Sequence, residues 1–176
     1  MASPEEIRAV LERAAHTVTV RPTVGQRVYA NTAVVESGLS CRVQEKNHSL
    51  TVDLPSSMGG EDSGPSPSVL LRAALSSCVA MGIKMWAVRT GVTIDRIEVR
   101  VETDVDARGQ FGVSETIAPG FESIRIRIQV DSAADRNVIW DTVQTSLRFS
   151  PLMDALRRGQ VVETQVNIDR RVLEDH

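Results

Sequence analysis

The sequence has few aromatic residues and few cysteines, and neither sign of charge dominates it. Aromatics make up 3% of the 176 residues, which argues against base-stacking or sugar-stacking platforms. The formal net charge of −3 gives no electrostatic footprint for nucleic acid or an anionic membrane. Two cysteines are too few for a disulfide scaffold. We therefore expect neither a nucleic-acid partner nor a membrane partner.

The usual signatures of metal, phosphate and export are missing too. His16, His48 and His176 show no metal-ligand spacing with one another or with the cysteines, so no metal site is expected. The glycine-rich segment 59–64 lacks the spacing of a P-loop or a dinucleotide-binding turn, and no cofactor is predicted. The first residues lack the basic-then-apolar order of a signal peptide, so the expected location is a reducing cytoplasm.

One long apolar segment, residues 67–91, organises the rest of the chain. Ser66 is a suitable N-cap, Pro67 suits the first helical position, and Gly91 can end the helix in a left-handed cap. Apolar residues occur on most sides of this predicted helix, which is typical of a buried one. Three basic residues interrupt it, so it is not expected to span a membrane.

Around this helix the sequence alternates as antiparallel strands do, with polar and apolar residues in turn. The pattern predicts helices over 4–15, 67–91, 132–150 and 152–158, and strands over 28–34, 41–44, 50–54, 96–102, 124–130 and 162–168. Runs of strands separated by helices indicate an α+β fold with antiparallel sheet. The first three strands alone cannot cover both sides of so apolar a helix. Either the later strands close over it or a second copy of the chain does.

Cys78 lies in the middle of the long helix, where its helical neighbours are apolar or small and favour an inert, packed thiol. It is about three turns from the helix N-terminus, beyond the reach of that macrodipole, so a reactive thiolate needs a cation from elsewhere. Cys41 and Arg42 lie on a strand that can cross the helix, and strand parity lets only one of them point inward. An inward Arg42 supplies the cation, whereas an inward Cys41 offers a disulfide partner.

Several segments, taken in order, resemble the OsmC/Ohr family of osmotically inducible and organic hydroperoxide resistance proteins. They are residues 52–55 (Val-Asp-Leu-Pro), 59–60 (Gly-Gly), 65–78 (from Pro-Ser-Pro to Ser-Ser-Cys), 120–124 (Gly-Phe-Glu-Ser-Ile) and 149–152 (Phe-Ser-Pro-Leu). Each is weakly specific alone, and the ordered set is more so. The resemblance implies an OsmC-like fold, with antiparallel sheets wrapped around a long central helix in an intertwined homodimer. It also implies a helical extension over 1–25 and an OsmC-like domain over 26–176.

The resemblance also implies a mechanism in which a helix cysteine attacks an organic hydroperoxide. Cys78 matches that peroxidatic position. Ser150 stands where the resolving cysteine belongs and cannot form the disulfide. Ser68 stands where the peroxidases carry a glutamate that holds the activating arginine, for which Arg42 is the nearest candidate. These two degenerate positions predict a one-cysteine enzyme whose sulfenic acid is resolved by an external dithiol or by Cys41.

Two other functions remain open under the rule that function depends on the site and not on the fold. The dimer cleft can bind or sense a small apolar or electrophilic molecule, or the protein can be a structural dimer with a degenerate site. The residues that can shape an apolar substrate pocket are Leu71, Leu75, Met81, Met85 and Trp86.

Overall fold

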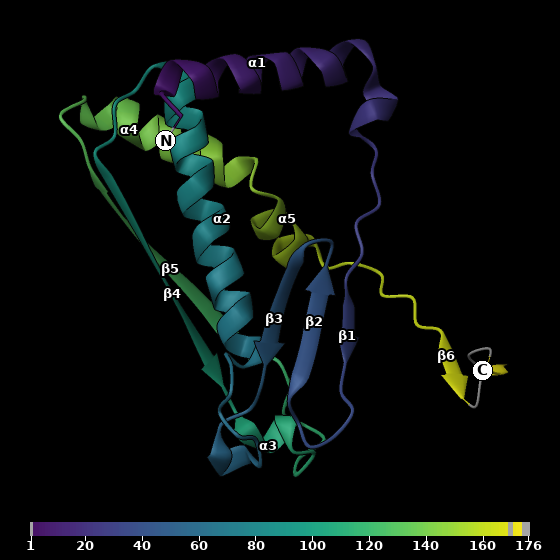
Figure 1. Ribbon diagram of the computed structural model, residues 1–176. Helices are drawn as coiled ribbons and strands as arrows, with labels where there is room; N and C mark the ends of the chain where they lie inside the picture. Colours follow the sequence, from purple (N-terminus) through teal and green to yellow (C-terminus); the bar gives the residue numbers. More distant parts are fainter. Residues whose placement is uncertain (1, 169–170, 174–176) are drawn as a thin grey trace.

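In the computed structural model, helix α2 (Pro67–Thr90) runs through the middle of the fold, with β4, α4, α1 and α5 packed against it, whereas β6 lies apart from it (Figure 1). The structure describes residues 2–168 and 171–173. Three antiparallel sheets and a long central helix make the α+β fold that the alternation predicted. The other elements are α1 (Pro4–Val20), η1 (Pro22–Gly25), β1 (Thr32–Val34), β2 (Cys41–Glu45), β3 (His48–Val52), η2 (Ser56–Met58), β4 (Arg96–Val105), α3 (Ala107–Gln110), β5 (Phe121–Asp131), α4 (Arg136–Arg148), α5 (Pro151–Arg158), β6 (Val166–Ile168) and β7 (Arg171–Leu173).

Helix α2 begins and ends as its sequence predicts. Pro67 occupies the first turn, and Gly91 adopts a left-handed φ of 77° that lets its N–H bond back to the last turn. The predicted N-cap differs in one respect. Ser66 has the extended backbone of a cap, but its hydroxyl forms no capping bond and lies 3.1 Å from the hydroxyl of Ser68. The proline at the first turn is therefore the stronger start signal.

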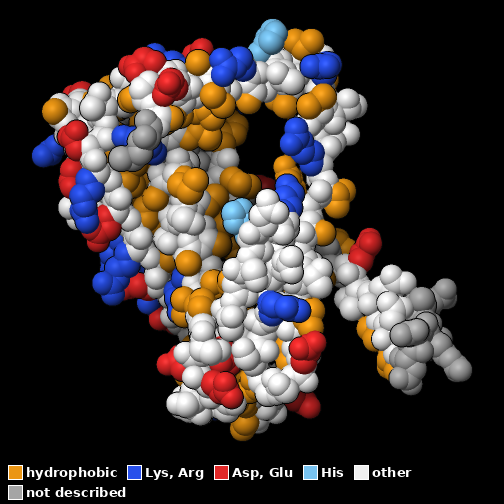
Figure 2. Space-filling model, viewed as in Figure 1, with side chains coloured by type: hydrophobic (Ala, Val, Ile, Leu, Met, Phe, Trp, Pro, Cys, Tyr) orange, Lys and Arg blue, Asp and Glu red, His pale blue; other side chains and the backbone are white. Residues whose placement is uncertain are grey.

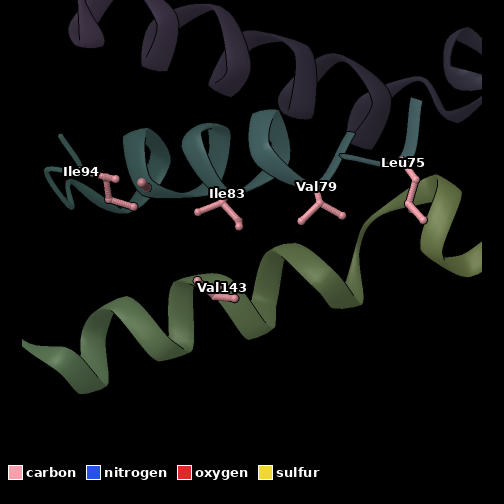
Figure 3. Packing of buried hydrophobic residues seen from close by; sticks show 6 residues of the cluster. Leu75, Val79, Ile83, Ile94 and Val143 are labelled. Carbon is pink, nitrogen blue, oxygen red and sulfur yellow. The ribbon is translucent and has the colours of Figure 1, made fainter. Parts of the chain in front are cut away.

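One face of α2 packs against the β4–β5 hairpin and α4 and forms the hydrophobic core (Figure 3). Leu75, Val79 and Ile83 follow one another at four-residue intervals along α2 and are fully buried. Ile94, which lies between α2 and β4, and Val143 of α4 close the cluster. This spacing is that of a helix with one covered side.

The β4–β5 hairpin is the most regular part of the sheet structure. Its two strands pair from Arg96↔Asp131 to Val105↔Phe121, with one irregularity between Asp104 and Val105. Most of its isoleucines and valines pack against the core, and the charged residues between them face water, as their alternation predicts. At the far end of the hairpin Val105 and Ile124 are exposed.

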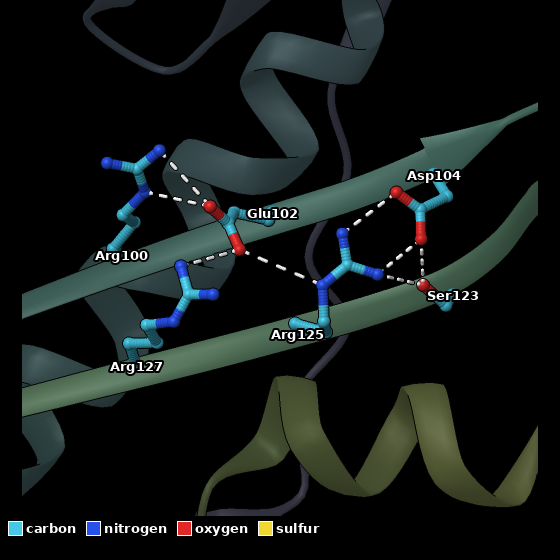
Figure 4. A network of polar contacts seen from close by, with 6 residues as sticks. All are labelled: Arg100, Glu102, Asp104, Ser123, Arg125 and Arg127. Atoms are coloured by element: carbon cyan, nitrogen blue, oxygen red, sulfur yellow. Dashed lines mark hydrogen bonds and ion pairs between the residues drawn. The ribbon is translucent and has the colours of Figure 1, made fainter.

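The water-facing side of this hairpin carries a network of ion pairs (Figure 4). Arg125 pairs with both Asp104 and Glu102, and Arg127 lies 2.8 Å from Glu102. Hydrogen bonds from Arg125 and then Ser123 hold the pKa of Asp104 well below its ordinary value. All these groups are exposed or partly exposed, so they act as a solvated strand face that salt screens.

The second sheet has the order β1-β2-β3 and is the predicted antiparallel meander. Its first strand is shorter than predicted, because only residues 32–34 find partners on β2. Residues 26–31 are extended and exposed without pairing.

Other elements differ from the predicted bounds as well. Strand β3 lies two residues earlier than the predicted 50–54, and β4 and β5 extend beyond 96–102 and 124–130. Helix α1 continues to Val20, since the first proline that stops it is Pro22. Helix α4 starts at Arg136, because the Asp135 carboxylate accepts the N–H groups that open the helix. Within the predicted last strand, residues 162–168, only Val166–Ile168 form a strand, and this strand, β6, pairs with β7 in a separate hairpin.

The other face of α2 is uncovered, so of the two predicted alternatives the first is wrong: the later strands do not close over the helix within one chain. Met81 is 71% exposed, and Leu71 and Met85 are exposed as well. Figure 2 shows hydrophobic side chains gathered along α2 and beneath α1 on this side. Helix α2 is long and apolar enough to cross a membrane, as core helices of soluble proteins can also be. Its packing against β4 and α4 is that of a core helix.

Candidate active site

Cys78 lies beside the start of a different helix, α5. Its Sγ is 3.5 Å from the Oγ of Ser150, the N-cap residue of α5. Phe149 ends α4 and Pro151 opens α5, so Ser150 is held at the junction between them. Cys78 is half-buried and Ser150 is 4% exposed. The fold thus brings together two residues that are 72 positions apart in the sequence.

The other hydrogen bond of Ser150 allows its hydroxyl to donate to the sulfur. Its Oγ accepts the backbone N–H of Met153 at 3.4 Å, which leaves its own hydrogen free to be donated to Cys78. The first-turn N–H groups of α5 carry the positive end of that helix dipole. The sequence argument considered only the dipole of α2, whose N-terminus is too distant. In the structure tertiary packing places the N-terminus of α5 beside Cys78, and the periodicity of the α2 sequence cannot reveal such a contact.

One helical turn beyond Cys78, α2 and α4 approach each other closely at Gly82. A Cβ atom added to Gly82 would lie 2.8 Å from the Oγ of Ser146. Ser146 is 2% exposed, and among the described residues its Oγ has no hydrogen-bond partner. The hydroxyl of Thr142, one turn earlier on α4 and also buried, donates to the carbonyl of Val138 at 2.8 Å. Ser146 is therefore the exception among the hydroxyls of this interface.

An aromatic stack fixes the residue that precedes Ser150. The rings of Phe149 and Trp86 stack with centroids 5.3 Å apart and an interplanar angle of 27°. The Arg89 guanidinium lies 4.3 Å from the Trp86 ring centroid, and that of Arg148 lies 5.3 Å from Phe149. Such contacts are each weak, but together they tie the end of α4 to α2.

Arg42 and Cys41 lie on opposite faces of β2, as strand parity requires. Cys41 is on the more covered face, opposite buried Val52 of β3, and Arg42 is on the exposed face. Arg42 lines a shallow hollow of about 410 Å³ and takes part in no ion pair between the described residues. Both cysteines are free thiols, and within the described part of this chain no hydrogen bond joins Arg42 or Cys41 to Cys78.

Ser68 lies in the first turn of α2, about 15 Å along the helix from Cys78. With Leu71 it lines a hollow of about 540 Å³. The rest of that lining consists of apolar and uncharged residues: Leu54, Pro55, Met58, Ser66, Pro67, Gln110, Pro119, Gly120 and Phe121. The hollow is suited to an apolar molecule, since none of these side chains is ionised.

The five predicted pocket residues do not gather at one place within the chain. Leu75 belongs to the covered core, Trp86 to the aromatic stack, and Leu71 to the hollow at the start of α2. Met81 and Met85 lie on the uncovered face of α2.

Asp53 holds the loop that leads into α2. Its side chain is 2% exposed and accepts hydrogen bonds from the backbone of Leu54, Glu61 and Ser63 and from the Ser63 hydroxyl. The bonds from Ser63 are the main reason that the pKa of Asp53 lies below its ordinary value. Sequence reasoning missed this role, although an acidic residue next to a proline-glycine loop is a signal for it.

The histidines are dispersed, with His16 on α1 and His48 on β3, while His176 lies outside the described residues. Over residues 2–168 and 171–173 the structure contains no group of three His, Cys, Asp or Glu side chains that could hold a metal ion.

Comparisons with known proteins extend this description. Residues 60–165 match the family model of OsmC-like proteins. The fold is similar to that of an OsmC-like protein from Mycoplasma pneumoniae, at 18% identity over 76% of this chain and 90% of that one, with a TM-score of 0.65. It is also similar to an organic hydroperoxide resistance protein OsmC from Legionella pneumophila, at 18% identity over 76% and 93% with a TM-score of 0.57.

A third similar structure is an organic hydroperoxide resistance protein from Elizabethkingia anophelis, at 16% identity over 76% of this chain and 91% of that one, with a TM-score of 0.59. At these identities the structural likeness establishes the fold. No curated protein matches the chain by sequence.

Proposed function

This chain belongs to the OsmC-like protein family, and on that premise we propose that it is a thiol-dependent peroxidase of organic hydroperoxides with Cys78 as its nucleophile. The observation that carries the proposal is the 3.5 Å contact between Cys78 Sγ and Ser150 Oγ at the N-terminus of α5. A hydroxyl in contact with the sulfur and the N–H groups at the start of α5 can stabilise negative charge on the sulfur as it reacts. Two structural neighbours are named organic hydroperoxide resistance proteins, which supports the choice of substrate.

In the proposed reaction the Cys78 thiolate attacks the terminal oxygen of the hydroperoxide and the O–O bond breaks. The sulfur is oxidised to a sulfenic acid, and the leaving alkoxide takes a proton and departs as an alcohol. The contact with Ser150 holds the sulfur at the start of α5 while its charge is transferred.

Ser150 gives the proposed cycle a one-cysteine character, because a hydroxyl cannot form a disulfide with Cys78. An external thiol then attacks the sulfenic sulfur, releasing water and forming a mixed disulfide. The second thiol of the same reductant displaces Cys78 and leaves as its own disulfide. Dithiols of this kind are maintained in a reducing compartment, so we place the reaction in the cytoplasm.

The proposed active form is an intertwined homodimer. An isolated chain leaves Leu71, Met81 and Met85 in water on one side of α2, and a second copy offers a matching apolar surface. In this arrangement Arg42, exposed on β2, is the proposed cation for the Cys78 thiolate of the other copy.

The decisive experiment compares Cys78→Ser with its matched control, Cys41→Ser. With stoichiometric cumene hydroperoxide we expect the wild type and Cys41→Ser to lose one reactive thiol rapidly, and Cys78→Ser to lose none. Equal peroxide consumption by Cys78→Ser would overturn the assignment. If Cys41→Ser consumes peroxide only once while the wild type turns over, Cys41 is the resolving thiol.

The uncharged hollow beside Ser68 and Leu71 favours a second candidate function, the binding of a small apolar molecule without turnover. Linoleic acid is a suitable probe. Binding that is unchanged in Cys78→Ser, weakened in Leu71→Asp and accompanied by no peroxide consumption in the wild type would establish this alternative.

A further inference from the structure

Ser146 presents a buried hydroxyl whose hydrogen-bonding capacity is unused. The residue is 2% exposed, and its Oγ has no partner among the described residues. Native proteins satisfy nearly all such groups, so each exception requires an explanation. Serine is also a poorer helix former than alanine, so helix propensity does not account for a hydroxyl at this position. In the reduced protein this hydroxyl makes no hydrogen bond among the described residues that would stabilise it.

The position of this hydroxyl relates it to Cys78. Gly82 follows Cys78 by four residues, so the two lie on one face of α2, about 6 Å apart along its axis. The Oγ of Ser146 lies 2.8 Å from the point that a Gly82 Cβ would occupy. In a helix the Cα–Cβ bond tilts toward the N-terminus, so that point is on the side of Gly82 nearer to Cys78.

Ser146 and Ser150 thus form two successive contacts of the α4–α5 segment with α2. Ser150 meets Cys78 and Ser146 meets Gly82, one turn further along. The Ser150 hydroxyl is already engaged, because it accepts the Met153 N–H and also contacts the sulfur. The Ser146 hydroxyl is the one that can still accept or donate.

Oxidation of Cys78 adds a polar atom about one helical turn from this hydroxyl. In the proposed peroxidase reaction one oxygen is transferred from the hydroperoxide to the sulfur, the O–O bond breaks, and the remainder leaves as an alcohol. The resulting sulfenate oxygen extends beyond Sγ and needs a hydrogen-bond donor if it is to be buried.

We infer that Ser146 is the donor that holds the sulfenate oxygen of oxidised Cys78, so that the sulfenic acid is a long-lived state of this protein. The inference rests on the proposed peroxidase function. In this inference the interface of α2 and α4 is apolar except for the Ser146 hydroxyl, which has room because Gly82 has no side chain. The hydroxyl gains its hydrogen-bond partner only after Cys78 is oxidised. Retaining the sulfenic acid suits a one-cysteine site, because the external thiol arrives by diffusion and the intermediate must survive until then.

The test uses the full chain, oxidised with two equivalents of cumene hydroperoxide and sampled over time, so that the first forms sulfenic acid and the second can oxidise it to sulfinic acid. Sulfenic acid is trapped with dimedone and sulfinic acid is counted by intact mass. We expect Ser146→Ala to form sulfenic acid at the wild-type rate and to lose it roughly 10- to 100-fold faster, the range for one hydrogen bond to a charged group. Its reduced form should melt at or above the wild-type temperature, since the replacement removes an unsatisfied hydroxyl.

Thr142→Val is the matched control, because it removes a buried hydroxyl on the same helix that already has a partner. Its sulfenic acid should last as long as that of the wild type. Gly82→Ala is a second, independent variant, since its new methyl group would displace the Ser146 hydroxyl. It should shorten the lifetime as Ser146→Ala does.

The outcomes separate the two proposals. If the wild type forms no sulfenic acid, the peroxidase proposal fails and this inference fails with it. If sulfenic acid forms but has the same lifetime in the wild type and in Ser146→Ala, only the role of Ser146 is overturned. An equal loss of lifetime in Thr142→Val also overturns it, because the effect would then be one of packing.

Discussion

The two faces of α2 have similar composition but opposite environments. Leu75, Val79 and Ile83 are fully buried against the β4–β5 hairpin and α4, whereas Met81 and Met85 point away from them into water. Both faces are apolar, so composition alone does not distinguish them. The difference teaches that the chain itself completes the covered face and leaves the apolar side chains of the open face in water.

Cys78 lies at the boundary between these faces. Its sulfur reaches the covered side through Ser150, and the residue remains half-buried. A nucleophile at such a boundary is oriented by its own chain and can still be approached from the open side.

The largest effect should come from removing a buried side chain on the covered face. Ile83→Ala leaves a cavity in the core and should lower the free energy of unfolding by about 2–5 kcal/mol. Urea denaturation at several protein concentrations measures this loss. Met81→Ala, two residues earlier on the open face, is the control. A loss of equal size in Met81→Ala that does not depend on protein concentration would contradict the distinction between the faces.

A charge on the open face should act on assembly and spare the fold of the chain. Met81→Lys places an ammonium group on the apolar face of each copy and should weaken self-association by roughly 100-fold, because the charge must be desolvated. Sedimentation equilibrium measures the dissociation constant. Val113→Lys is the matched control, since Val113 is 74% exposed and lies in the loop before β5. If both variants associate as the wild type does, the open face is not the dimer interface.

The smallest effect concerns the loop that joins the β1–β3 sheet to α2. Asp53 is ionised in the folded state with a pKa below its ordinary value. Its contribution to stability is therefore present above about pH 4 and is lost as the pH falls through the lowered pKa. Asp53→Asn should lower the melting temperature by roughly 5 °C at pH 7 and should flatten the acid limb of the stability curve, because an amide cannot accept all four hydrogen bonds.

Asp62→Asn is the control for this measurement. Asp62 is exposed in the same loop and has a positive φ that asparagine also adopts. Melting temperatures recorded between pH 3 and pH 8 should separate the two variants. An unchanged acid limb in Asp53→Asn would show that the Asp53 carboxylate does not connect the loop to the fold.

The sequence predicts the elements better than it predicts the site. The strict alternation of 96–102 and 124–130 identifies β4 and β5, since each strand has one buried and one wet face. Cys78 is also identified from the sequence, by its resemblance to the family pattern. Its environment is not, because the approach of α5 is a tertiary contact and α2 gives no local sign of it.

The interpretation of Ser150 differs between the sequence and the structure. In the sequence it is only a missing cysteine, and in the structure its hydroxyl contacts the sulfur. The sequence indicates the position of Ser146 only weakly and indirectly, through Gly82. A glycine within a long helix costs about 1 kcal/mol relative to alanine, which indicates a close approach at Gly82 without revealing its partner. Arg42 cannot be placed relative to Cys78 from one chain, because the proposed contact needs two.

The close approach at Gly82 also constrains how this interface can change. A methyl group at position 82 meets a side-chain oxygen of the opposite helix and no backbone atom. Alanine at position 82 fits once position 146 has lost its hydroxyl, so we expect substitutions at the two positions to depend on each other. A homologue with alanine at position 82 would have a more stable α2 but would lack the Ser146 hydroxyl. By the inference above, its Cys78 sulfenic acid would then be shorter-lived.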